Sequence, residues 1–464
     1  MAQPRTMKDL TQGSVVKHLV QMAAFLAVSM LAQTLYLLAD LYWVGRLGKE
    51  AIAAVALAGN LTMLVVAVTQ MLGVGTTALI AQASGRKDQP QAEHIFNQSF
   101  VMSLFVAVGL GVVAFLFRGI YCDILSADPI TARLARSYML WFIPGVLLQF
   151  PLVAMGSALR ATGIIKPAVG LQVLSVALNM ILAPLLVFGL VGLPRLGVTG
   201  AALATFISIL VADALMVVYF QTKYHYLRFR VAQWRPEFGT WWSMLRIGLP
   251  AGAEFVLFFV NVLIVYAIIR DFGPAAQAGF GVGSRVMQAL FLPVVALAFA
   301  VSPVVGQNFG GGFADRVRHS IYAAIGIASG VMAILALVAH FAPTSLIRGF
   351  SNDPRVLAFG SEYLRIVALN FVASGIVFAA SSAFQGLGNT LPPLFSSFTR
   401  VSLFVGLALL LSHQAGFHIR EIWYLSVATQ VFQACLSLYL LWRELGKKLT
   451  FNPSAAAVPG IASA

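Results

Sequence analysis

Long apolar segments follow one another along almost the whole chain. Twelve of them offer about 20 or more mainly apolar positions, which is enough to cross a bilayer as a helix. They cover residues 16–44, 52–80, 95–117, 134–158, 167–190, 198–221, 244–269, 276–304, 319–342, 359–384, 391–412 and 421–442. Only helices and closed barrels satisfy their backbone hydrogen bonds in lipid, and these runs are too long for barrel strands. The pattern predicts an all-α integral membrane protein with twelve transmembrane helices.

The composition agrees with a chain that has lipid as its main solvent. Of the 464 residues, 59% are hydrophobic and only 10% are charged, whereas soluble domains carry about 25% charged residues. The formal net charge of +14 would suggest nucleic acid as the partner of a soluble protein. Here basic residues are expected in cytoplasmic loops, and no basic run is interleaved with aromatic residues as a nucleic-acid groove requires. We therefore expect the lipid bilayer, and no nucleic acid, as a partner.

Charge in the loops predicts the orientation of the chain. Seventeen basic residues fall in the loops on the side of the N-terminus, and ten fall in the opposite loops. This asymmetry favours both termini in the cytoplasm of a multi-pass protein of the bacterial inner membrane. The first apolar run lacks a cleavage pattern and is expected to be a retained helix. Cys122 and Cys435 are expected on opposite sides of the membrane, so we expect no disulfide, and no metal site or cofactor is indicated.

A repeat at a constant offset of 225 residues is the strongest internal signal. It pairs polar and turn-forming residues in the loops as well as apolar ones: Gly48 with Gly273, Gln82 with Gln307, Gly85 with Gly310, Asp128 with Asp353, Tyr138 with Tyr363, Gly163 with Gly388 and Pro167 with Pro392. The repeat predicts two homologous six-helix lobes at 1–222 and 241–445, a cytoplasmic linker at 223–240 and a cytoplasmic tail at 446–464. An even number of spans per lobe makes the repeats parallel, as in transporters with a central cleft.

Three of the sixteen acidic residues lie well inside predicted spans, and such residues are candidates for function. Asp40 follows Gln33 and Tyr36 by seven and four residues, so the three share one helical face. A low dielectric favours the protonated form of a carboxyl, so Asp40 suits a proton or sodium site. The alternative is an acid near the outer interface, because the span ends soon afterwards at Gly45.

The second half of the chain offers weaker candidates. Glu254 and Asn261 are seven residues apart on one face of the seventh span and could bind substrate or cation. The alternative for Glu254 is an ion pair with Arg285 of the eighth span. Arg400, deep in the eleventh span, must be paired or hydrated. In the first half, Asp213 of the sixth span is expected to have a structural partner.

Several segments resemble the multidrug and toxic compound extrusion (MATE) transporters, with the DinF-like branch as the nearest. The first-helix segment runs from Leu38 to Gly48 and reads LADLYWVGRLG. Further matching segments are AQASG from Ala81, ALRATG from Ala158, ALNMILAPL from Ala177, GVTGAA from Gly197, GLP from Gly248 and QGLGN from Gln385. The resemblance covers residues 15–445.

The resemblance implies roles for individual residues. Asp40 matches the first-helix acid that binds the coupling cation, Asn179 matches a neighbouring Asn, and Thr205 lies where a hydroxyl lines the same cavity. Ala183 stands where some members carry a second carboxylate, and no acid occurs between residues 365 and 389, where another branch has one. For Glu254, the family's acid in this helix lies about a turn later. These departures favour protons over sodium as the coupling ion.

The resemblance implies a secondary antiporter that moves an amphipathic, cationic small molecule outward in exchange for protons or sodium. We expect a monomer and no enzymatic activity, because no phosphate-binding loop and no HExxH or GxSxG motif occurs. A lipid-linked oligosaccharide flippase of the same superfamily remains an alternative, although a strongly basic cleft and additional spans are not evident. An integral-membrane enzyme, the alternative from another class, would need a cluster of acids, His or Cys at one interface.

Overall fold

Helices make up almost all of the computed structural model, which describes residues 7–126, 128–414 and 416–449. Twelve of its helical segments are long and apolar enough to cross a membrane. The α-helices are α1 (Val15–Gly45), α2 (Lys49–Gly85), α3 (Gln89–Leu125), α4 (Pro129–Leu147), α5 (Gln149–Ala161), α6 (Lys166–Phe188), α7 (Val198–Thr222), α8 (Phe238–Ile269), α9 (Pro274–Gly310), α10 (Ala314–Phe341), α11 (Pro343–Arg348), α12 (Pro354–Val367), α13 (Phe371–Gly386), α14 (Leu391–Ser412) and α15 (Ile419–Lys448). Short 3-10 turns lie at Leu190–Gly192 (η1), Val231–Gln233 (η2), Arg270–Phe272 (η3) and Ala368–Asn370 (η4).

The predicted spans match the observed ones closely. Ten of the twelve predicted ranges fall within the membrane-length segments, and the other two extend past the end by one or two residues. The sequence did not predict that the fourth span of each lobe is interrupted. The first interruption lies between α4 and α5, four residues after Pro144, and the second lies at η4 between α12 and α13. Proline lacks a backbone donor and its ring crowds the carbonyl four residues earlier, so Pro151 in the first turn of α5 explains the break after Leu147.

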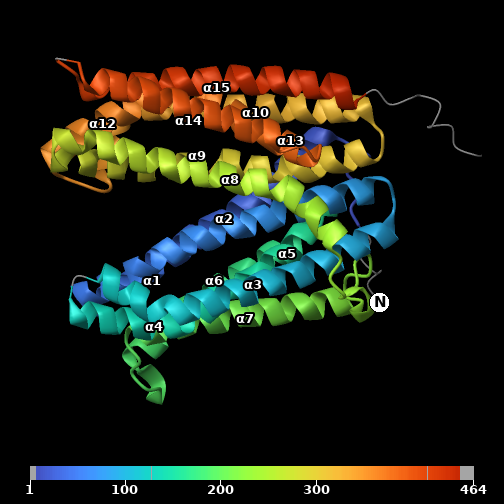
Figure 1. Cartoon of the computed structure of the whole chain (residues 1–464), viewed down its shortest axis with the longest axis horizontal. Coiled ribbons are helices and arrows are strands. Elements are labelled where there is room, and N and C mark those ends of the chain that lie inside the picture. Colours follow the sequence, from blue (N-terminus) through green and yellow to red (C-terminus); the bar gives the residue numbers. More distant parts are fainter. Residues whose placement is uncertain (1–6, 127, 415, 450–464) are drawn as a thin grey trace, which may run out of the picture.

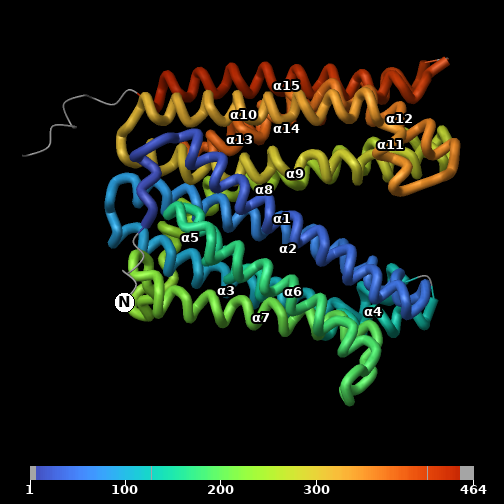
Figure 2. Tube along the Cα trace, turned by 180° about the vertical axis from the view of Figure 1, so that it is seen from behind, coloured from blue at the N-terminus to red at the C-terminus, as the bar shows by residue number. Residues whose placement is uncertain are grey.

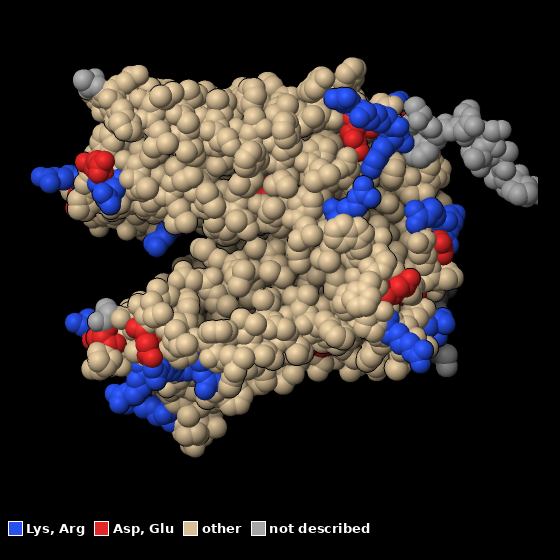
Figure 3. Space-filling view, viewed as in Figure 1, with Lys and Arg blue, Asp and Glu red and all other residues tan. Residues whose placement is uncertain are grey.

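The helices form two lobes, with α1–α7 in one and α8–α15 in the other (Figures 1 and 2). The lobes meet at one end and diverge at the other, so a space-filling view is hollowed between them (Figure 3). The two ends of the described chain lie where the lobes meet, which we call the closed end. Charged side chains gather at both ends of this face, and the surface between them is nearly uncharged (Figure 3). Such a belt is what a lipid-facing surface requires.

Helix bounds repeat between the lobes at the predicted offset of 225 residues. Both bounds of α2 are displaced by this number in α9, and the segment from α4 to α5 is related in the same way to the segment from α12 to α13. Asp128 and Asp353 each precede a proline and accept bonds from backbone amides of the following helix. Equivalent residues therefore begin equivalent helices.

Gln82 and Gln307 make equivalent contacts across the closed end. The Gln82 side-chain amide donates to the Gly386 carbonyl over 2.9 Å, and the Gln307 amide donates to the Ala161 carbonyl over 2.8 Å. Residues 386 and 161 are themselves 225 apart. Each glutamine thus reaches from its own lobe to the end of the broken helix in the other lobe, which confirms the duplication.

The segment before α1 joins both lobes at the closed end. The Lys8 amide donates to the Thr162 carbonyl of the first lobe, and the Leu10 amide donates to Gln307 Oε1 of the second, both over 2.9 Å. Leu10 is fully buried. Burial, together with the nearby ammonium groups of Lys17 and Lys166, lowers the pKa of Lys8.

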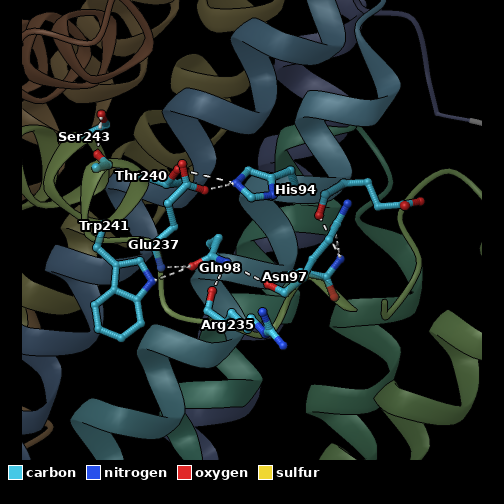
Figure 4. Close-up of polar contacts among 11 residues, drawn as sticks. His94, Asn97, Gln98, Arg235, Glu237, Thr240, Trp241 and Ser243 are labelled. Atoms are coloured by element: carbon cyan, nitrogen blue, oxygen red, sulfur yellow. Dashed lines mark hydrogen bonds and ion pairs between the residues drawn. The ribbon is translucent and has the colours of Figure 1, made fainter. Parts of the chain in front are cut away.

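The linker between the lobes is fastened to α3 (Figure 4). Asn97 Oδ1 accepts bonds from the Arg230 amide and the Trp234 indole, and Gln98 Oε1 accepts from the Glu237 amide and the Trp241 indole. Polar residues of α3 therefore hold the linker against the first lobe. Residues 450–464 of the predicted tail lie outside the described residues.

Candidate functional site

A cavity of about 400 Å³ lies inside the first lobe, among α1, α5, α6 and α7. Hydrophobic side chains make up part of its wall, and the remainder is polar. The polar lining residues are Ser29, Gln33 and Tyr36 of α1, Gln149 and Arg160 of α5, Gln172, Ser175 and Asn179 of α6, and Thr205 and Ser208 of α7. Small-molecule sites combine apolar walls with converging polar groups, and this cavity has both, with a large polar share.

Three of the predicted site residues are joined by hydrogen bonds around Thr205. The Thr205 hydroxyl lies 2.9 Å from the Tyr36 hydroxyl and accepts a bond from Asn179 Nδ2 over 3.1 Å. It also donates to the Ala201 carbonyl of its own helix over 3.2 Å. These residues come from α1, α6 and α7, so the cluster links three helices on one side of the cavity.

Asp40 lies one turn beyond Tyr36 toward the open end. Its side chain is only 7% exposed, and Oδ1 has no hydrogen-bond partner among the described residues. It is close enough to Tyr36 and Tyr138 for electrostatic coupling, although it makes no hydrogen bond to Asn179 or Thr205. A buried carboxyl oxygen without a partner is costly unless the group is protonated or binds a cation.

Glu254 lies in a second, smaller polar site inside the other lobe. Its carboxylate accepts bonds from Ser381 of α13 over 2.9 Å and Ser397 of α14 over 3.1 Å, and Gln433 donates to the same Ser397 hydroxyl. The ion pair considered between Glu254 and Arg285 is therefore wrong, because hydroxyls satisfy the acid and Arg285 is exposed. Asn261 does not join this site, and its buried Oδ1 has no partner in the described chain.

The repeat relates the two polar sites to each other. Four residues that line the first cavity stand 225 positions before four residues of the second site, namely Ser29 before Glu254, Gly156 before Ser381, Gln172 before Ser397 and Ser208 before Gln433. The two lobes therefore present different chemistry at equivalent places. A serine in the first lobe corresponds to a carboxylate in the second.

Asp213 and Arg400 are two further charged residues within the membrane-spanning helices. Both carboxylate oxygens of Asp213 lack a hydrogen-bond partner within the described residues, so the structural partner expected for Asp213 is absent there. Arg400 lies near Tyr363, and its Nε is buried without a partner in the same part of the chain. Within the described chain, no carboxylate lies within ion-pair distance of Arg400, and no basic group lies within that distance of Asp213.

Several lining residues were not predicted. Gln172 and Ser175 precede the predicted Asn179 by seven and four residues, which places all three on one helical face. That pattern could have indicated a polar stripe on the fifth span. Arg160 lies within the ALRATG segment, and nothing in the sequence shows that it turns toward the cavity.

Comparison with known proteins places these features in a family. The MatE family model matches residues 26–185 and 250–410. The FAD transporter of Shewanella oneidensis is 26% identical over 369 residues, covering 79% of this chain and 81% of that protein. The multidrug export protein MepA of Staphylococcus haemolyticus is 26% identical over 450 residues, covering 96% and 97%.

Solved structures share the architecture. A MOP superfamily transporter from Pyrococcus furiosus, described as having a binding pocket of reverse polarity, superposes with a TM-score of 0.87 at 25% identity, covering 96% of this chain and 100% of that one. The bent form of the Vibrio cholerae MATE transporter VcmN has a TM-score of 0.87 at 22% identity, covering 95% and 99%, and supports the fold alone. The family model spans more than half of the sequence, in both lobes, and the chain therefore belongs to the MatE family of multidrug and toxic compound extrusion transporters.

Proposed function

We propose that this protein is a secondary active efflux transporter that exchanges inward movement of protons for outward movement of an amphipathic small molecule. The observation that carries the proposal is the position of Asp40, a buried carboxyl with an unpartnered oxygen beside the polar cavity of the first lobe. Such a group can take up a proton from one side of the membrane and release it when the cleft opens to the other side. Exchange requires only that the cation and the substrate favour different states of the transporter.

The coupling site proposed here consists of Asp40 with Tyr36, Asn179 and Thr205, and Gln33 belongs to the substrate-binding surface. Sodium prefers several oxygen ligands around a formal charge, as hard cations do. The hydroxyls of Tyr36 and Thr205 are engaged with each other, and Ala183 offers no second carboxylate. This favours protons over sodium. Glu254 with its two serines is the proposed second binding site, and Asn261 lies seven residues away on the same helix.

The orientation follows from the loop charges. We place both termini, the 223–240 linker and the closed end in the cytoplasm, so the cleft faces the outside of the inner membrane. The lobe boundaries at 222 and 241, the DinF-like branch and the monomeric state are parts of the same proposal.

The names of the relatives support small-molecule export rather than the alternatives. They describe a FAD transporter and multidrug export or resistance proteins, which favours neither an oligosaccharide flippase nor a membrane enzyme. The compound named among them, FAD, carries an anionic pyrophosphate. The cationic substrate expected from the sequence is therefore tested against an anionic one.

Purified protein in liposomes tests the proposal. Uptake of fluorescent probes is measured at a clamped membrane potential, under either a pH gradient or a sodium gradient. We expect a pH gradient to accelerate transport of at least one probe. Stimulation by sodium at clamped pH, with no response to a pH gradient, would reject protons as the coupling ion, and no gradient-driven transport of any probe would reject the function.

A further inference from the structure

Arg160 is the one charged residue among those that line the cavity of the first lobe in the described structure. It is located in the last turn of α5, two residues before Thr162, whose carbonyl binds the segment that precedes α1. It therefore lies toward the closed end. Neither Asp40 nor Asp213 belongs to the cavity wall.

The guanidinium of Arg160 has little to neutralise it. Its Nη2 donates to the Ser157 hydroxyl over 2.7 Å, and its Cζ lies 5.9 Å from the centre of the Phe299 ring of the other lobe. Within the described chain no carboxylate forms an ion pair with it. A guanidinium has five N–H donors in a planar fork that fits a carboxylate or phosphate. One donor is used, and a poorly solvated charge without a counter-ion is unfavourable.

The repeat shows that the two lobes carry opposite charges in their polar sites. The residue equivalent to Arg160 in the second lobe is the neutral Gln385, whereas the acid of that lobe, Glu254, corresponds to Ser29 in the first. The first lobe thus has a base and no acid on its cavity wall, while the second has an acid in its small pocket. A cationic substrate would meet a like charge in the larger cavity.

We infer that the cavity of the first lobe binds an amphipathic organic anion, with the carboxylate, sulfonate or phosphate of the substrate on Arg160. The apolar body of the substrate lies against Leu26, Leu152 and Val153 of the same cavity. This inference rests on the proposed efflux function and names its substrate class. It replaces the cationic compound that the sequence suggested.

Proton exchange remains compatible with an anionic substrate. Asp40 lies one turn beyond Tyr36 toward the open end and outside the cavity wall, whereas Arg160 lines that wall toward the closed end. A substrate anion on Arg160 and a proton on Asp40 therefore do not compete for one place. Exchange requires only that the substrate anion and the proton favour different arrangements of the two lobes.

The test compares pyrene probes that share one aromatic body. The wild-type protein is titrated with 1-pyrenebutyrate, neutral 1-pyrenebutanol and cationic 1-pyrenylmethyl-trimethylammonium, and binding is followed by fluorescence. A charge-assisted, two-pronged hydrogen bond corresponds to about 10- to 100-fold in affinity. We expect the wild type to bind the anion about tenfold or more tighter than the alcohol, and the cation most weakly. A wild type that prefers the cationic probe overturns the inference without any variant.

Variants then assign the preference to Arg160. Arg160→Gln is expected to lose the preference for the anion while binding the alcohol as before, and Arg160→Lys to retain part of it. Arg133→Gln, which changes an exposed arginine at the other end of the same lobe, is the matched control. If Arg160→Gln keeps the anion preference, the assignment is wrong. Gradient-driven transport of the cation alone, unaffected by Arg160→Gln, would leave the efflux function standing and refute the anion site.

Discussion

Gly85 permits the close contact between the lobes at the closed end. A Cβ at this position would lie 2.0 Å from the Gln307 carbonyl oxygen, and a Cβ at the equivalent Gly310 would lie 2.0 Å from the Gln82 carbonyl oxygen. Both neighbours are backbone atoms that no change of rotamer can move. Ordinary carbon–oxygen contact needs more than 3 Å, so Gly85→Ala must separate the helices by about 1 Å or more.

The expected cost follows from this geometry. Overpacking of a tight contact costs about 1–3 kcal/mol, which is a shift of roughly 5- to 150-fold against the closed arrangement. Because an alanine inside a helix otherwise stabilises it by about 0.5–1 kcal/mol over glycine, the sign of the effect is diagnostic. Gly330→Ala in α10, where a Cβ would meet nothing within 4 Å, is the matched control.

Spin labels at Arg86 and Arg318, in a background without the two native cysteines, report the distance across the closed end. We expect Gly85→Ala to populate longer distances and to lower the unfolding temperature in detergent. Gly330→Ala should leave the distance unchanged and should not lower the unfolding temperature. An unchanged distance distribution together with unchanged stability in Gly85→Ala would show that the lobes do not pack as described.

Three further predictions concern other parts of the fold. Leu10→Ala removes a fully buried side chain from the closed end and should cost about 2–5 kcal/mol in thermal unfolding; no loss would mean that this segment is not docked in solution. Thr205→Val leaves the Asn179 amide without its acceptor and should cost roughly 1–2 kcal/mol and slow transport; wild-type rate and stability would contradict the cluster. Hydrogen bonds from the Thr131 side chain and backbone lower the pKa of Asp128 in the loop before α4. The folded pKa is then below the unfolded one, so its stabilisation is present above about pH 4 and is lost as pH falls through the folded value. Asp128→Asn should therefore unfold with a weaker dependence on pH below 4 than wild type, and an equal dependence would refute this.

The helices and the duplication could be predicted because lipid imposes a simple rule on sequence. Each span must be apolar for about 20 residues, and the loop residues that turn the chain, such as Gly48 and Asp128, are repeated at a fixed offset. The breaks in the fourth span of each lobe were not predicted. Hydropathy does not change at a break, and Pro144 alone does not show whether a helix bends or ends there.

The site was predictable only in part, for a related reason. Helical period placed Gln33 and Tyr36 on one face, and both line the cavity. The serines that satisfy Glu254 lie 127 and 143 residues away in sequence, so only the packing of α8 with α13 and α14 brings them together. The direction of Arg160 likewise depends on how α5 is rotated after the break, which periodicity does not reveal.

The central claim is that Asp40 couples proton movement to efflux, and its most direct test is transport by Asp40→Asn. The measurement is probe efflux from liposomes under a pH gradient at clamped potential, with Asp213→Asn as a matched control for a second buried acid, and with unfolding temperature as a check on folding. We predict that Asp40→Asn folds, binds the probe and loses both gradient-driven efflux and its pH dependence. Efflux at the wild-type rate by folded Asp40→Asn, with an unchanged response to the pH gradient, would contradict the account.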